Sequence, residues 1–458
     1  MNRNLWLVCF LLFASFAGWS QTFPNTKEKF VKDFQKKISE YSDSELNKFV
    51  KDEFSVLLLE TQEFPNEYFA KLVETCNKME VKRLKVYPEI YNYIYSVTTF
   101  VRSSQPKESY LAWHSTVDKM LESRQVKKIK SFVEFTAGFL SDGNISASSN
   151  FAWFYLGGNY AFEFDSKVSV KLTGGTLVCR AIGKSGSTRG QVVDSLRVIE
   201  TDGLYDPVLK KWIGKGGKIT WNKVGLDPTK TFAVLNTYNL SLKSSTIRVD
   251  SVLLTTPYFE NPILGLLTDR AFKINREEDK VYPQFLSVEK SLVIHEIVKD
   301  VDYIGGFALQ GPGFIGTGSD LERAKITIKR NGTSFITAKA KQIAISTQKI
   351  NVYRGEMALK FKTGDSLTHP GINLVYDLEK KQVQFTREQS GIGQAPFQDS
   401  YHKLDIYVPK IVWNLEEEEL HFTFEFGTSQ EQRLARFESQ AYFDARLYDR
   451  LQSMEATH

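Results

Sequence analysis

Apolar residues recur at three- and four-residue spacing between about residues 26 and 140. This period predicts amphipathic helices, each with one buried face. The pattern separates into six segments with these apolar stripes: Phe30, Phe34, Ile38 and Tyr41; Leu46, Phe49 and Phe54; Phe69, Leu72, Val73, Cys76 and Met79; Ile90, Tyr93, Ile94, Val97, Phe100 and Val101; Tyr110, Trp113, Val117 and Leu121; and Val126, Ile129, Phe132, Val133 and Phe139.

The helices fall into pairs that begin near Thr26, Asn66 and Lys107. A repeat of about 40 residues is typical of helix-turn-helix solenoids. The consensus of tetratricopeptide repeats is missing, so an ordinary small helical bundle is an equal alternative. Ser42 and Glu45 fit a capping box at the start of the second helix. Either arrangement provides a docking surface rather than a reaction chamber.

From Gly143 onward the pattern changes to short runs in which apolar and polar residues alternate, as in strands. Asn331-Gly332 between two such runs predicts a tight antiparallel hairpin. The runs are Tyr160–Phe164, Val168–Leu172, Leu177–Ile182, Leu196–Glu200, Lys218–Trp221, Phe232–Leu242, Ile247–Leu254, Ala324–Lys329, Phe335–Ile345 and Phe422–Phe426. We therefore predict an α+β protein, with an α-helical domain of helical hairpins over residues 21–142 and an elongated all-β domain, jellyroll- or solenoid-like, over residues 143–427.

Two stretches of the β region resemble each other and suggest two related units of about 100 residues. Ile213-Gly214-Lys215-Gly216, Lys218-Ile219-Thr220, Phe232 and Ile247-Arg248-Val249 parallel Ile315-Gly316-Thr317-Gly318, Lys325-Ile326-Thr327, Phe335 and Ile350-Asn351-Val352. Chance similarity between β-rich segments is the alternative. Helical spacing returns over residues 428–458, which predicts a C-terminal helix that packs back on the β region or begins a further domain.

The first twenty residues have the pattern of a secretory signal peptide. Arg3 precedes the apolar run Leu5–Phe16, and Gly18-Trp19-Ser20 supplies small residues for cleavage after Ser20. We expect an exported protein of the periplasm or of the outer membrane and cell surface. No later stretch is apolar for the roughly 20 residues that a membrane helix needs, so we expect no transmembrane segment in the mature chain.

Composition narrows the classes of partner and fold. Of 458 residues, 42% are hydrophobic and 25% charged, which indicates a globular chain rather than a disordered one. The net charge of +5 is small and the Lys and Arg residues are dispersed, which argues against a nucleic-acid partner. Cys76 and Cys179 are too few to frame a domain. A buried thiol is the preferred interpretation of Cys76, with a disulfide between the two as the alternative.

Residues 324–387 resemble the OstA-like β-jellyroll of lipopolysaccharide-transport proteins. The similarity lies in a strand, a short turn, Ile336-Thr337-Ala338-Lys339-Ala340, a further strand, and Arg354-Gly355-Glu356 leading into Leu359-Lys360-Phe361 and Gly364-Asp365. Lys339 stands where the family usually has an acidic residue. The resemblance implies an open, twisted double-sheet fold of the cell envelope that can line up edge to edge or hold an acyl chain.

Some stretches resemble known catalytic or cofactor-binding motifs, but their spacing or the residues around them do not fit those motifs. Gly311-Pro312-Gly313-Phe314-Ile315-Gly316 has dinucleotide-loop spacing, but a strand follows it instead of a helix. Gly214-Lys215-Gly216-Gly217-Lys218 lacks the spacing of a phosphate-binding loop. The histidines, none of them spaced as metal ligands, are His114, His295, His369, His402, His421 and His458. We expect His114 to be a partly buried structural residue.

Carboxylates are the remaining candidates for chemistry, because glycan cleavage uses two of them. Asp194, Asp250, Asp365 and Asp399 each precede a serine, a pair that is common in turns. Glu416 to Glu419 fits a solvated strand edge. Four aromatic residues could stack on sugars, but core packing is the simpler explanation for them: Trp153, Tyr155, Trp212 and Trp221.

These observations favour a non-enzymatic structural or binding scaffold of the cell envelope, with a lipid, glycolipid or protein partner. We propose no catalytic, cofactor-binding or metal-binding residue and no cofactor. The alternative is a glycan-active enzyme, a lyase or hydrolase, on a β-rich scaffold.

Overall fold

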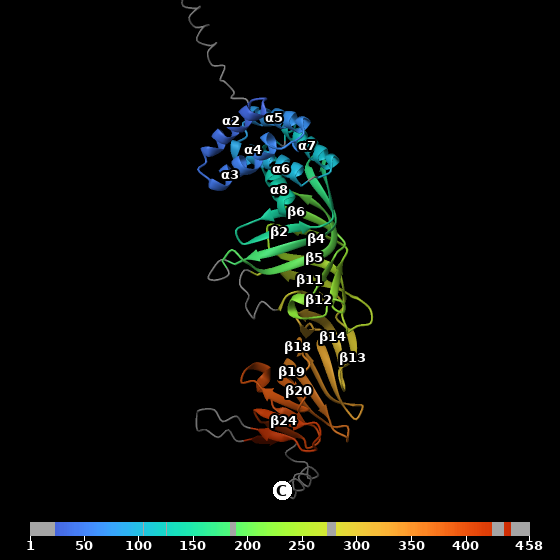
Figure 1. Ribbon diagram of the computed structural model, residues 1–458. Coiled ribbons are helices and arrows are strands. Elements are labelled where there is room, and N and C mark those ends of the chain that lie inside the picture. Colours follow the sequence, from blue (N-terminus) through green and yellow to red (C-terminus); the bar gives the residue numbers. More distant parts are fainter. Residues whose placement is uncertain are drawn as a thin grey trace, which may run out of the picture. The chain divides into compact units, whose positions relative to one another are not determined.

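The computed structural model describes residues 23–103, 105–124, 126–183, 189–272, 281–423 and 435–440 (Figure 1). The predicted signal peptide lies outside these ranges. The chain divides into two compact units: unit 1 comprises Met1–Gly217, Thr237–Ser245 and Ala271–Ile274, and unit 2 comprises Lys218–Asn236, Thr246–Arg270 and Asn275–His458. In the described ranges, no helix is long and apolar enough to cross a membrane.

Unit 1 opens with the predicted helices. They are α2 (Lys27–Ser39), α3 (Ser44–Lys48), α4 (Ser55–Leu59), α5 (Asn66–Val81), α6 (Tyr91–Arg102), α7 (Lys107–Glu122) and α8 (Ile129–Asp142), with π-helical turns at Phe49–Phe54 and Val86–Ile90. The predicted pair starts agree with α2, α5 and α7. The predicted capping box is wrong by one residue. Ser42 has a φ of 52°, and Asp43 caps α3 by accepting from the amides of Glu45 and Leu46.

Helix gives way to strand at Gly143, as the composition predicts. Gly143 ends α8 with a φ of 78°, a left-handed conformation that glycine adopts without steric cost. The helices then pack on the first strands through aromatic rings. Phe132 of α8 lies 5.9 Å from Phe162, and Phe135 lies 5.3 Å from Tyr205, measured between ring centroids. The helices and the first sheet therefore share one core within unit 1.

The strands of unit 1 form an antiparallel sheet. They are β1 (Asn144–Ala147), β2 (Phe151–Leu156), β3 (Asn159–Phe164), β4 (Val168–Ile182), β5 (Val192–Asp206), β6 (Lys211–Lys215) and β9 (Thr237–Ser241). The long β4 pairs with β2, β3 and β5, and β6 pairs with β5 and β9. Trp153, Tyr205 and Trp212 are fully buried in this unit.

Unit 2 continues as an antiparallel β structure. Its strands are β7 (Lys218–Thr220), β8 (Phe232–Leu235), β10 (Thr246–Thr255), β11 (Ile263–Arg270), β12 (Gln284–Ser287), β13 (Leu292–Val298), β14 (Val301–Gln310), β15 (Gly313–Thr317), β16 (Ala324–Arg330), β17 (Thr333–Ala340), β18 (Gln342–Ile345), β19 (Lys349–Lys360), β20 (Ser366–Asp377), β21 (Gln382–Arg387), β22 (Phe397–Asp399), β23 (Leu404–Tyr407), β24 (Lys410–Asn414), β25 (His421–Thr423) and β26 (Arg436–Ser439).

The predicted hairpin at Asn331-Gly332 joins β16 to β17. Both residues have positive φ, 54° and 75°, as the tight turn requires. Together with the helices of unit 1, these strands confirm the α+β class.

Strand pairing repeats along the β region with the same register. β6 and β9 place Trp212 opposite Leu240 and Gly214 opposite Tyr238. β15 and β18 place Phe314 opposite Ile345 and Gly316 opposite Ile343. Equivalent residues of β6 and β15 are therefore separated by a constant number of positions in the sequence, and so are those of β9 and β18. The β7–β8 and β16–β17 pairs likewise match, with Ile219 opposite Ala233 in one and Ile326 opposite Ala338 in the other.

The repeat extends to an irregularity. β10 and β11 shift register between Val249 and Val252, and β19 and β20 shift between Val352 and Gly355, at the equivalent positions. One detail of the sequence alignment is corrected. Phe232 lies opposite Thr220, whereas Thr337 lies opposite Thr327, so Thr337 and not Phe335 is the equivalent of Phe232.

The same order of strand pairings begins again near the end of the described chain. β24 pairs with β25 as β14 pairs with β15, and β23 pairs with β26 as β14 pairs with β16. This pairing overturns part of the predicted C-terminal helix, because residues 436–439 form a strand whose backbone hydrogen bonds go to Leu404–Tyr407. The remainder of that prediction, over residues 441–458, lies outside the described ranges.

Candidate functional site

Four aliphatic side chains of unit 2 form a row across neighbouring strands and point away from the core. Val234 of β8 lies opposite Leu253 of β10, which lies opposite Leu264 of β11. The amide of Val288 then donates to the Leu264 carbonyl at 3.0 Å. The exposed fractions of Val234, Leu253, Leu264 and Val288 are 44%, 46%, 48% and 60%. Half-exposed aliphatic residues in direct register make a continuous apolar surface.

Adjacent positions widen this surface. Leu286 of β12, 39% exposed, lies between Leu266 and Ala308. Val293 of β13 lies opposite Ile304 of β14, and both are at least 40% exposed. We call the following set the aliphatic strip: Val234, Leu253, Leu264, Leu286, Val288, Val293 and Ile304. The Lys290 side chain packs over Gly306 of β14, between Leu286 and Ile304, so the strip consists of the row with Leu286 and a separate apolar pair, Val293 and Ile304. Exposed apolar residues grouped in this way mark an interaction site more often than a scattered exposed leucine does.

The strip is not a requirement of the sheet. Residues that alternate with it, such as Ala233, Leu254 and Leu267, already fill the core. The strand register repeats further along the chain, in β17, β19, β20 and the residue after β21. There, the positions equivalent to Val234, Leu253, Leu264 and Val288 are occupied, in this order, by Lys339, Glu356, Gly371 and Glu388. The same backbone therefore accepts charged side chains on this face, and folding alone does not explain the apolar ones.

The row of the strip has opposite charges at its two ends. Lys218 lies opposite Val234, and its Nζ is 3.8 Å from the Phe232 ring centroid. Glu289 follows Val288 at the other end. Its Oε1 accepts from the Ser291 hydroxyl at 2.5 Å and from the Ser291 amide at 3.1 Å, and these hydrogen bonds lower the pKa of the Glu289 carboxyl. Lys290 follows, and its Nζ turns back to donate to the Ser287 carbonyl at 2.9 Å. One end of the row thus has the cation Lys218, and the other has a carboxylate that stays ionised at neutral pH beside the cation of Lys290.

A second candidate lies at a corner of unit 2, where two of the four aspartates meet. Ser400 donates to the Asp365 carboxylate at 3.2 Å and accepts from the Ser366 amide at 2.9 Å. Asp399 accepts from the amides of Tyr401 and His402 and lies 2.7 Å from His402 Nδ1. An open pocket of about 350 Å³ adjoins this corner, lined by Thr368, Gln398, Ser400, Lys403, Asp405 and Gln440.

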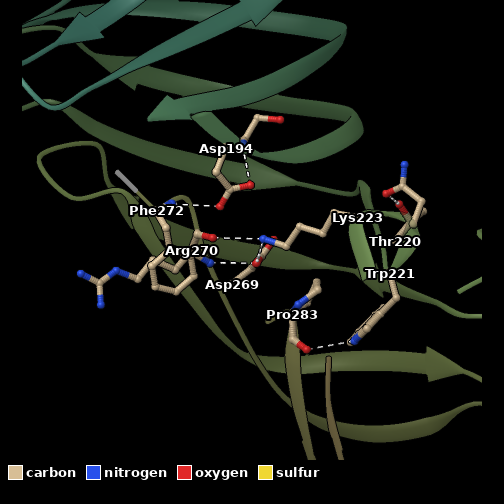
Figure 2. A network of polar contacts seen from close by, with 10 residues as sticks. Asp194, Thr220, Trp221, Lys223, Asp269, Arg270, Phe272 and Pro283 are labelled. Carbon is tan, nitrogen blue, oxygen red and sulfur yellow. Dashed lines mark hydrogen bonds and ion pairs between the residues drawn. The ribbon is translucent and has the colours of Figure 1, made fainter. Parts of the chain in front are cut away.

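The other two aspartates lie elsewhere. In unit 1, Asp194 accepts from its own Ser195 amide at 2.7 Å and from the Phe272 amide at 2.9 Å (Figure 2). Asp250 is largely exposed and lies 3.4 Å from the Nε of Arg248. Three of the four therefore cap backbone or turn groups, and within unit 2 only Asp365 and Asp399 come together.

Figure 2 also shows an ion pair in unit 2 that no pattern in the sequence indicated. Lys223 donates to the Asp269 carboxylate at 2.7 Å and to the Arg270 carbonyl at 3.0 Å, and Asp269 is 2% exposed. Lys223 lies in the short 3-10 helix Asn222–Val224 and Asp269 near the end of β11. The pair ties the loop after β7 to the edge of the sheet and keeps the buried carboxylate paired.

The four candidate sugar-stacking residues are buried: Trp153, Trp212 and Trp221 are 0% exposed and Tyr155 is 3% exposed. The indole of Trp153 donates to the Ser244 carbonyl at 2.9 Å, and that of Trp221 donates to the Pro283 carbonyl at 3.0 Å (Figure 2). Rings in these positions pack the core and offer no free face to a sugar.

His114 is a buried structural residue, as expected. Its Nε2 lies 3.2 Å from the Thr75 hydroxyl and 3.1 Å from the Tyr93 hydroxyl, and its Nδ1 lies 3.1 Å from the Asp118 carboxylate. This network joins α5, α6 and α7 inside the helical part. Cys76 is also fully buried and free, and burial raises the pKa of its thiol well above its usual value. Cys179 is buried as well, and the two cysteines form no disulfide with each other.

The remaining motifs form turns and edges. Gly311-Pro312 is the turn of the β14–β15 hairpin, and Gly216-Gly217 follows β6. Glu416 and Glu417 follow β24, where Glu416 pairs with Lys381 and the Glu417 carbonyl accepts from the Trp413 indole at 3.0 Å. Within the described ranges, no three His, Cys, Asp or Glu side chains are grouped so that they could hold a metal ion.

Comparisons with known proteins add no relative: no family model matches the chain, and neither does any curated protein or solved structure.

Proposed function

We propose that this protein is an exported, non-enzymatic scaffold of the cell envelope whose unit 2 associates with a partner through the aliphatic strip. The single observation that carries the proposal is the row of half-exposed Val and Leu residues in direct cross-strand register. Antiparallel sheets normally direct polar side chains to water on their outer face, and an apolar row gains free energy only when something covers it.

The candidate carboxylates and aromatics support a scaffold as well. Asp194 and Asp365 each bind backbone or hydroxyl donors of turns, and the Trp rings fill the core. The partner is a lipid, a glycolipid or a protein of the envelope. We further propose a solenoid-like succession of related jellyroll units, because the strand register recurs. The resemblance to OstA-like jellyrolls also remains a proposal, supported by the antiparallel strands β16 to β21 over residues 324–387.

A glycan-active enzyme is the second candidate, and the corner with Asp399 and His402 is the observation in its favour. The Asp399 carboxylate lies 2.7 Å from the His402 imidazole, a geometry that proton transfer can use, but neither side chain lines the polar pocket nearby. Burial of all four candidate aromatic platforms weighs against it.

One experiment separates the two candidates. The purified protein and its Asp399→Asn variant are incubated with envelope glycans and a polysaccharide panel, and new reducing ends and unsaturated products are measured. The scaffold proposal predicts that neither protein releases product. Release by the unmodified protein that Asp399→Asn abolishes would show an enzyme.

Export has a test of its own. We expect the protein recovered from the periplasm or outer-membrane fraction to begin at Gln21, as measured by intact mass and N-terminal sequencing. A chain that keeps residues 1–20, or one that stays in the cytoplasm, would contradict this part of the proposal.

A further inference from the structure

The aliphatic strip has the composition of a sheet-packing layer. Its members are Val, Leu and Ile, and the row from Val234 to Val288 contains neither an aromatic anchor nor a hydrogen-bonding side chain. Sheets that pack face to face interdigitate aliphatic side chains of this kind about 10 Å apart. A surface without unpaired polar groups can be covered by its own copy at no cost in buried hydrogen-bonding groups.

We propose that a second copy of this chain covers the strip, in a two-fold symmetric dimer in which the rows of the two copies run antiparallel. The row spans β8, β10, β11 and the end of β12, so at about 4.8 Å per strand it is about 14 Å long, and Lys218 on β7 extends it to about 19 Å. A two-fold axis near Leu253 and Leu264 sets each row on the other in reverse, and every residue of the patch then meets the same patch of the partner.

Charge favours this occupant and this orientation. Reversal brings Lys218 of one row next to the exposed Glu289 of the partner's row, at both ends of the interface, while the Lys290 ammonium is held by the Ser287 carbonyl at 2.9 Å. A parallel arrangement would set like charges together, which costs free energy at an interface. The internal comparison agrees, because the equivalent row in the next repeat, with Lys339, Glu356 and Glu388, lacks the apolar side chains that such packing needs.

The alternative occupant is a lipid surface. Membrane-binding faces usually carry exposed Trp or Phe among their apolar residues, and the strip has none. The ring on the same face of β8, Phe232, is only partly exposed, and the Lys218 ammonium lies over it at 3.8 Å. The dimer deepens the proposed function, since it rests on the strip as the association surface and names the partner. Its test uses the purified full chain alone, so a monomer in that test would remove the dimer and leave the glycan assay of the scaffold proposal unaffected.

The test is sedimentation velocity of the purified chain over a range of concentrations, with Val234→Lys and Leu253→Glu as strip variants. These changes install the residues found at the equivalent positions Lys339 and Glu356, so we expect the fold to tolerate them. We expect a dimer for the unmodified chain and at least tenfold weaker association for each variant. Ile213→Lys is the matched control, because Ile213 is 53% exposed on β6 outside the strip. It should leave dimerisation unchanged.

The orientation is tested by charge exchange. Lys218→Glu and Glu289→Lys should each weaken the dimer about tenfold, and the double variant should recover most of the loss. Far-UV circular dichroism and the melting temperature identify any variant that fails to fold.

A monomeric unmodified chain at every concentration, or a dimer that Leu253→Glu leaves intact, would overturn the proposal. A monomer that binds vesicles of anionic and zwitterionic phospholipid would replace the second copy by a lipid surface. Failure of the double variant to recover would overturn the antiparallel orientation.

Discussion

At the scale of single residues, His369 shows how a buried polar group is fixed in one protonation state. Its Nδ1 accepts from the Gly371 amide at 3.0 Å, so its Nε2 carries the proton and donates to the Ala395 carbonyl at 2.9 Å. The side chain is almost fully buried, and burial lowers the pKa of His369 to about 4. A second proton on the ring would lie on Nδ1 and point at the N–H of Gly371, which already donates to that atom. The neutral ring is therefore part of the folded state.

This arrangement predicts a loss of stability in acid. The folded pKa of about 4 lies below the ordinary value of 6.5, so the unfolded chain binds more protons between these two pH values. The contribution of His369 to the free energy of unfolding is complete above pH 6.5 and is lost as the pH falls towards 4. We expect a loss of about 3 kcal/mol at pH 4.

Urea unfolding at a series of pH values measures this loss. His369→Gln should be less stable than the unmodified protein at pH 8 and should lose less further stability between pH 6.5 and 4. Equal slopes for the two proteins would show that His369 does not titrate on unfolding.

A turn residue gives the second test at this scale. Gly332 has a φ of 75° and open space where a Cβ would lie, so Gly332→Ala tests conformation alone. We expect it to lower the free energy of unfolding by about 1 kcal/mol. Gly313→Ala is the control, because Gly313 has no positive φ and its Cβ would meet only an ordinary van der Waals contact at 3.4 Å. An equal cost for both variants would contradict the strain at Gly332.

At the scale of elements, the local pattern of apolar and polar residues predicted where most helices begin but missed some strands. The helices that begin at Lys27, Asn66 and Lys107 follow from spacing, because a single buried face repeats every turn. β20 was missed because His369-Pro370-Gly371 interrupts its alternation. The strand persists since its two halves pair with different partners, β22 at Leu367 and β21 at Ile372. The sequence predicts a helix over residues 436–439 because Leu434 and Phe437 are three residues apart. In the structure these residues form a strand, because they pair with β23.

The helix–sheet core of unit 1 gives the prediction at this scale. Phe162 of β3 is 6% exposed and packs on Phe132 of α8, so Phe162→Ala opens a cavity between helix and sheet. We expect about 3 kcal/mol of destabilisation, with faster hydrogen exchange in α8 and β3 together. Leu111→Ala, at an exposed position of α7, should cost well under 1 kcal/mol. Faster exchange in β3 alone would show that the helices do not share this core.

At the scale of the whole molecule, the proposed function depends on what covers the aliphatic strip. The sequence contained its signal, since Val252-Leu253-Leu254 and Ile263-Leu264 are apolar on both strand faces. The sequence alone does not reveal which of the two faces is buried in the core, because that depends on the strands with which each strand pairs. Four aspartates and four aromatic residues were more conspicuous in the sequence, and most of them lie in turns or in the core.

The most direct measurement is disulfide trapping of Leu253→Cys, since the native Cys76 and Cys179 are buried. Leu253 lies near the proposed two-fold axis, so under mild oxidation the purified variant should form a covalent dimer at concentrations where Ile213→Cys stays monomeric. Equal and slow cross-linking of both variants, at concentrations where the dimer should be populated, would contradict a second copy packed on the strip.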